Sequence, residues 1–144
     1  MNVETFADYI LSEKDWIKKM EIVYYLQKRT GIFYDNSVVF KTLLTKLFID
    51  RVDLEIDKNE VITASLLWSC KKELTAKDIS KIHSFAKEGA EYLSKLGFSD
   101  KFCRICEGVT RYSGLEPREK ESDILELTDQ FGGMLLDRPE RIAF

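Results

Sequence analysis

Apolar residues recur at spacings of three and four along nearly the whole chain, and this spacing restricts its fold more than any other feature. It places apolar side chains on one face of an α-helix, whereas a half-buried strand alternates with a period of two. Both prolines, Pro117 and Pro139, come late, so no earlier segment is interrupted by proline. The sequence therefore predicts an all-α fold.

Capping residues and turns divide the pattern into separate helices. Ser12, Asp35 to Ser37, Thr75 and Ser99 are the expected N-caps, and Gly31 and Gly97 lie just past helix ends. The predicted helical segments are 3–11, 13–28, 39–48, 61–70, the stretch between Thr75 and Gly97, the stretch from Ser99 to Val109, and 124–135. The apolar segment 61–70 is expected to be central to the core.

Composition excludes several classes of protein. The chain has 144 residues, the size of one domain, and its formal net charge is −3, so it lacks the basic excess that favours nucleic-acid binding. No apolar run approaches the roughly 20 residues that span a bilayer. The first residues lack the basic start of a signal peptide. Three cysteines are an odd number and suggest no disulfide framework, so we expect a reducing, cytoplasmic location without membrane contact.

Four stretches in the second half carry a resemblance. Residues 64–72 read ASLLWSCKK, 89–93 read GAEYL, 111–114 read RYSG, and 124–141 read ILELTDQFGGMLLDRPER. In this order they resemble AALLHDIGK, GAxIL, HHExxDGxGYP and IxxVADxFDALTSxRPYR of the HD superfamily of phosphohydrolases, most closely its HD-GYP branch of cyclic-di-GMP phosphodiesterases. The resemblance implies an HD-like helical bundle over 35–144, with 1–34 as an extra N-terminal helical region in one compact unit.

The metal ligands of that family are replaced here. In the family, the HD dyad and later histidines bind metal ions that activate a water. The dyad reads Trp68-Ser69, the next histidine falls on Phe85, and the paired histidines fall on Gly108 and Val109. Of the ligand positions only Asp129 is retained. The resemblance therefore implies a degenerate domain without metal, cofactor or catalytic residues, and not an enzyme.

Other reactive residue types have plainer interpretations. His83 lies two residues before the family position, which turns it about 200° around a helix, away from that site. Cys103 and Cys106 have the spacing of half a zinc site, but on a predicted helix they read as core residues. Gly132 and Gly133 are interpreted as close packing of the last helix against a neighbour.

Three basic residues match family positions that contact substrate phosphates. Arg138 and Arg141 correspond to the basic residues of RPYR, and Lys72 corresponds to the lysine of HDxGK. Guanidinium groups suit phosphate geometry. The resemblance thus leaves open an anion-binding remnant, against the plainer interpretation that Asp137-Arg138-Pro139 ends a helix.

The segment 13–28 is apolar on two sides. Ile22 and Tyr25 fall opposite its main apolar stripe, where a simple surface helix would be polar. The first short helix could cover them through Phe6, Tyr9 and Ile10, or a second chain could. Because aromatic anchors concentrate binding energy in interfaces, we predict self-association or partner binding through Ile22 and Tyr25.

These observations favour a non-catalytic protein-interaction or regulatory scaffold. The alternatives are a sensor that binds a nucleotide or other phosphate without hydrolysis, and a phosphohydrolase with an altered site. Eight residues are predicted to share one core: Leu66, Leu67, Phe85, Leu93, Ile105, Val109, Leu125 and Phe131.

Overall fold

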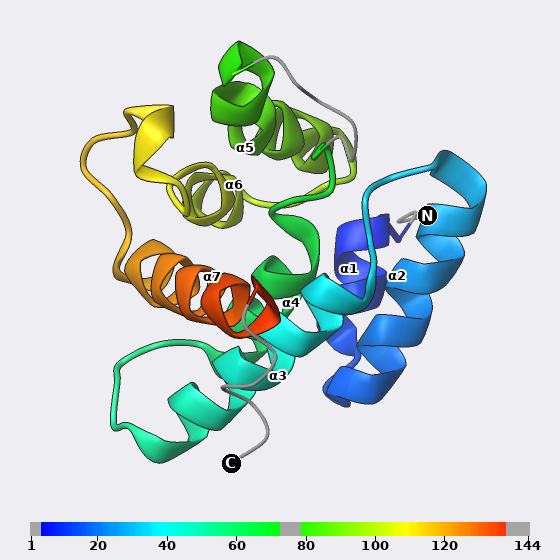
Figure 1. Ribbon diagram of the computed structural model, residues 1–144. Coiled ribbons are helices and arrows are strands. Elements are labelled where there is room, and N and C mark those ends of the chain that lie inside the picture. Colours follow the sequence, from blue (N-terminus) through cyan, green and yellow to red (C-terminus); the bar gives the residue numbers. More distant parts are fainter. Residues whose placement is uncertain (1–3, 73–78, 138–144) are drawn as a thin grey trace.

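The computed structural model describes residues 4–72 and 79–137, with the backbone alone for 79–84. Within these residues the chain forms seven α-helices and one 3₁₀ turn, without a β-strand, which confirms the all-α prediction (Figure 1). Among the described helices, none is long and apolar enough to cross a membrane. The elements are α1 (Phe6–Ser12), α2 (Trp16–Thr30), α3 (Asn36–Arg51), α4 (Lys58–Leu67), α5 (Ile79–Lys95), α6 (Asp100–Glu107), η1 (Arg111–Ser113) and α7 (Lys120–Asp137).

Most of the predicted caps that fall within the described residues are confirmed. The Asp35 carboxylate accepts the N–H groups of Ser37 and Val38, and the Ser99 hydroxyl accepts that of Phe102. Gly31 ends α2 with φ +72°, a conformation that glycine adopts without strain. The Thr75 cap lies outside the described residues.

One predicted cap is wrong. Asp15, not Ser12, begins α2, because its carboxylate accepts the Ile17 N–H at 2.9 Å. The Ser12 hydroxyl donates instead to the Tyr9 carbonyl at 2.7 Å, inside the last turn of α1. The preceding helix therefore already uses this hydroxyl.

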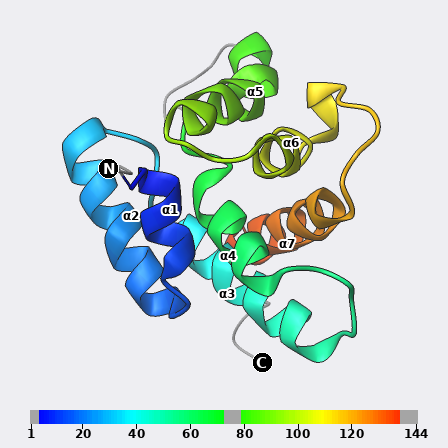
Figure 2. The same cartoon turned by 180° about the vertical axis from the view of Figure 1, so that it is seen from behind.

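Helix α4 forms the centre of the fold. Every residue from Val61 to Cys70 is buried, as predicted for this segment. The other described helices surround α4, with α1 and α2 on one side, α5 and α6 on another, and α3 and α7 packed against each other on a third (Figures 1 and 2).

The predicted core is confirmed except at one position. Leu66, Leu67, Leu93, Ile105, Val109 and Leu125 are buried, and Phe85 is half-buried against them. Phe131, however, is 49% exposed. It follows Leu125 by six residues, which turns it about 120° away from the buried side of α7.

The N-terminal helices pack on the rest of the chain. The Ala7 N–H donates to the Leu96 carbonyl at 3.1 Å, and the Phe33 N–H donates to the Cys70 carbonyl at 2.8 Å. A Cβ at Gly97 would lie 2.6 Å from the Thr5 side chain. These contacts join the described part of the N-terminal region to the residues that directly follow α4 and α5.

Candidate functional site

A cavity of about 210 Å³ lies between α3, α4, α5, η1 and α7. The resemblance placed nine positions around one family site. Of these, Gly108 and Val109 do not line the cavity, and Arg138 and Arg141 lie outside the described residues. The other five line it: Trp68, Ser69, Lys72, Phe85 and Asp129. They come from three separated stretches of sequence. We call this space the Trp68 cavity.

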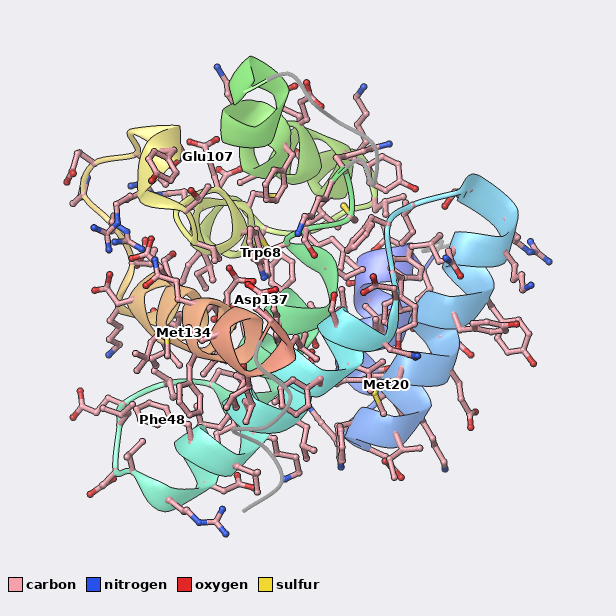
Figure 3. All side chains as sticks on the ribbon, viewed as in Figure 1. Met20, Phe48, Trp68, Glu107, Met134 and Asp137 are labelled. Atoms are coloured by element: carbon pink, nitrogen blue, oxygen red, sulfur yellow. The ribbon has the colours of Figure 1, made fainter. Side chains whose placement is uncertain are left out.

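Aromatic rings occupy two of the positions that the resemblance aligns with histidines. The ring centroids of Trp68 and Phe85 lie 5.4 Å apart, with the planes tilted by 32°. Trp68 ends α4 at the middle of the molecule, between α6 and α7 (Figure 3). A Cβ at Gly89 would lie 3.1 Å from the Trp68 carbonyl oxygen, so glycine permits α5 to approach this closely. The two rings therefore form an apolar wall of the cavity.

The remaining family carboxylate has a partner on another helix. The Lys41 ammonium of α3 pairs with Asp129 of α7 at 2.9 Å, and both side chains are partly buried. Sequence reasoning missed Lys41, which lies outside the matched motifs. One feature of the sequence could have pointed to Lys41: it is a charged residue between Val38 and Thr42, which both lie on the buried side of α3.

Close to this ion pair, hydroxyl groups of α3, α4 and α7 form hydrogen bonds with one another. The Thr42 and Ser65 hydroxyl oxygens lie 2.9 Å apart, and those of Thr45 and Thr128 lie 2.8 Å apart. Thr45 also donates to the Lys41 carbonyl at 2.9 Å. Because buried polar groups are costly unless paired, this cluster fixes how α3, α4 and α7 meet. No sequence motif pointed to it.

The predicted anion-binding residues are only partly described. Lys72 lines the Trp68 cavity, is exposed, and holds its Nζ 5.5 Å from the centre of the Phe33 ring. Arg138 and Arg141 lie outside the described residues. Among described residues the cavity thus has two lysines, Lys41 and Lys72, and one carboxylate, Asp129. This lining can hold a small polar or anionic molecule.

Cys70, Cys103 and Cys106 are free thiols in the structure. Burial raises the pKa of the Cys70 thiol to about 12 and holds that of Cys106 well above its usual range. The pKa of Cys103 is also raised, first by burial and then by Asp100 and Glu107. Protonated thiols are poor nucleophiles and metal ligands. Nowhere in 4–72 or 79–137 do three His, Cys, Asp or Glu side chains gather as a metal site would need; the His83 side chain lies outside the described set.

The structure separates the two predicted interface residues of α2. Ile22 is half-buried and packs against the core, together with Phe6 of α1. Tyr25 is 67% exposed, and its ring meets that of Tyr24 edge-on at 5.9 Å. Interface binding through this pair stays a prediction, with Tyr25 as its accessible member.

Comparison with known proteins adds no relative: no protein-family model, no curated protein and no solved structure matches this chain.

Proposed function

We propose that the chain is a degenerate, non-catalytic HD-like domain that acts as a protein-interaction scaffold. The convergence of Trp68, Ser69, Lys72, Phe85 and Asp129 on one cavity supports the HD-like assignment, because the resemblance aligned these positions from separate stretches of sequence. The aligned Gly108 and Val109 are not among the residues that line it. The aromatic pair and the Lys41–Asp129 ion pair in that cavity support loss of catalysis.

An exposed apolar surface on α3 and α7 carries the interaction proposal. Leu47, Leu127, Phe131 and Met134 are 42%, 53%, 49% and 50% exposed. Figure 3 shows Phe48 of α3 and Met134 of α7 on the same side of the molecule. Between the two helices lies a groove of about 260 Å³, lined almost entirely by apolar side chains. The α3–α7 face consists of Leu44, Leu47, Phe48, Leu127, Phe131 and Met134.

The shape of the face suggests the partner. Leu127, Phe131 and Met134 follow one another at spacings of four and three along α7, and Leu44, Leu47 and Phe48 form the opposite row on α3. Two such rows around a groove suit the apolar stripe of an amphipathic helix. We propose that a helix of a partner protein binds there.

Site-specific photo-crosslinking tests the proposal. A benzoylphenylalanine at Phe131 of the full chain, expressed in its native host, should form one dominant covalent adduct. The same probe at Tyr112, which is 66% exposed on η1, is the matched control and should form none. Leu127→Glu should abolish the Phe131 adduct without unfolding the chain. Equal yields at both positions would contradict the proposal, and an adduct of twice the chain mass would assign a second copy as the partner.

A phosphate-binding sensor is the second candidate, favoured by Lys41, Lys72 and several hydroxyl groups around the Trp68 cavity. Calorimetric titration with cyclic dinucleotides and nucleoside phosphates tests it. Binding should weaken about tenfold in Lys72→Ala and in Arg138→Ala if these residues hold the phosphate. Heat signals that are the same in both variants and the wild type would remove the sensor.

A further inference from the structure

A second cavity, of about 190 Å³, lies between the start of α2, the second half of α3 and the start of α4. It is separate from both the Trp68 cavity and the α3–α7 face. Its walls combine lysines with apolar side chains: Lys14, Lys19, Lys46 and Lys58 beside Trp16, Ile49 and Ile62, together with Asp50 and Asn59.

Lys19 is a buried cation without a counter-ion. The residue is 1% exposed, and its Nζ donates to the Ile10 carbonyl at 2.6 Å and to the Thr63 hydroxyl at 2.8 Å. Both acceptors are neutral, and no carboxylate of the described residues forms an ion pair with this ammonium. Burying a charge beside neutral groups alone is costly. Because the ammonium group has three N–H bonds and makes two hydrogen bonds, its third N–H has no acceptor among the described residues.

Burial lowers the pKa of Lys19 to about 8, with Lys14 as the next cause. Glu13 and Asp57 act in the opposite direction but are too weak to restore the usual pKa. At neutral pH the side chain is still mainly protonated. A residue that lines the cavity thus carries a positive charge under ordinary conditions.

The rest of the lining adds to this positive charge. Asp50 is the one carboxylate among the described lining residues, and it pairs with Lys46 at 2.6 Å and Lys58 at 3.6 Å. Four lysines against one aspartate give the lining a net charge of +3, in a chain whose net charge is −3. On the same wall, the buried Oδ1 of Asn59 has no partner among the described residues. The lining therefore carries an excess of positive charge and one hydrogen-bond acceptor without a donor in the described part of the chain.

We propose that this cavity binds a small organic phosphate, with Lys19 as the buried cation at its wall and Lys14 and Lys58 at its rim. Ammonium groups bind phosphate as point charges from several directions. Trp16, Ile49 and Ile62 provide an apolar surface for the organic part, which inorganic phosphate would leave uncovered. The proposal does not depend on the function proposed for the α3–α7 face.

Calorimetric titration of the full chain with phenyl phosphate, at constant ionic strength set by sodium chloride, tests the proposal. The expected dissociation constant is about 1 mM or below, and inorganic phosphate should bind at least about tenfold more weakly. Lys19→Met should weaken phenyl phosphate binding by about tenfold or more. Lys87→Met, which removes an exposed lysine on α5, is the matched control and should leave binding unchanged.

Three results would overturn the proposal: no binding by the wild type, unchanged binding in folded Lys19→Met, or equal affinities for phenyl phosphate and inorganic phosphate. If Lys19→Met does not fold, the variant Lys14→Gln/Lys58→Gln replaces it, since both residues are exposed and lie at the rim. That double variant should lose affinity severalfold, and full retention would equally reject the site.

Discussion

Asp129 and Lys41 illustrate at the scale of single residues how a partly buried carboxylate is paired with a residue from another helix. A carboxylate in a partly buried cavity needs a positive partner. Here an ammonium group from α3 lies 2.9 Å away and provides it within the chain. The pair supports the proposal that Asp129 has a structural role, which is to hold α7 against α3.

Lys19 gives a prediction about pH. Its folded-state pKa of about 8 lies below the ordinary 10.5, so between these values the unfolded chain binds more protons. The free energy of unfolding therefore increases as the pH rises through this window. Lys19 contributes up to about 3 kcal/mol to this increase. Urea unfolding of wild type and Lys19→Met, at intervals from pH 7 to 10.5, should show the wild type gaining stability relative to the variant.

The comparison with Lys19→Met is essential because other groups act in the opposite sense. The pKa values of Cys70 and Tyr34 are raised to about 12 by burial, so the unfolded chain loses those protons first and stability falls at high pH. The wild type and Lys19→Met share that fall in stability. A stability difference that stays constant between pH 8 and 10.5 would show that Lys19 is not desolvated as described.

At the scale of helices, sequence predicted what depends on neighbours along the chain. Caps such as Asp35 and Ser99 and the burial of 61–70 follow from local hydrogen bonds and apolar spacing. Sequence could not predict Lys41 beside Asp129, because the two residues are 88 positions apart. It also missed Lys19 beside Thr63, 44 positions away. Polar pairs between helices leave no periodic pattern in the sequence. Lys41 and Asp129 nevertheless line the Trp68 cavity, and Lys19 lines the second cavity.

Two adjacent glycines of α7 give a matched pair of variants. A Cβ at Gly132 would lie 2.6 Å from Lys41 Cγ, whereas a Cβ at Gly133 meets nothing within 4 Å. Gly133→Ala should therefore stabilise by about 1 kcal/mol through helix propensity. Gly132→Ala should be about 1–3 kcal/mol less stable than Gly133→Ala because it displaces Lys41. Denaturant unfolding of both variants measures the difference, and equal stabilities would mean that α7 packs less closely on α3.

The central position of α4 predicts a large cost for a cavity there. Leu67 is fully buried at the end of this helix. Leu67→Ala should lower the free energy of unfolding by about 2–5 kcal/mol. Urea denaturation at fixed pH is the measurement. A loss below about 1 kcal/mol would show that α4 is not at the centre of the core.

Ile22 and Tyr25 of α2 should respond differently to the same substitution. Ile22→Glu places a charge against the core and should cost about 2 kcal/mol or more. Tyr25→Glu, at a 67% exposed position, should change stability by less than about 0.5 kcal/mol. Thermal unfolding measures both effects. Light scattering on folded Tyr25→Glu then tests the predicted interface, since unchanged mass and unchanged partner capture would exclude Tyr25 from it.

At the scale of the whole molecule, the described helices around α4 form two cavities lined by both charged and apolar side chains, and the apolar α3–α7 face is exposed. The Trp68 cavity lies at the C-terminal end of α4 and the lysine-lined cavity at its N-terminal end. The α3–α7 face lies on the outer side of the α3–α7 pair. Because the three surfaces involve largely different residues, variants at one should leave the others intact, so each proposal can be tested alone.

The last prediction is that the chain holds no stoichiometric transition metal and does not hydrolyse phosphodiesters. Metal-assisted hydrolysis requires several ligands around an open position. The aligned positions provide an indole at Trp68, a phenyl ring at Phe85 and a carboxylate at Asp129 that is paired with Lys41. Elemental analysis of the purified chain and an assay with cyclic dinucleotides are the measurements. About one manganese, iron or zinc ion per chain, removed by chelation together with turnover, would contradict the prediction.

Trp68→His/Phe85→His restores two ligand side chains and is the informative comparison. If the cavity retains the family geometry, this variant should bind metal more tightly than the wild type, whereas unchanged metal binding would count against the HD-like assignment.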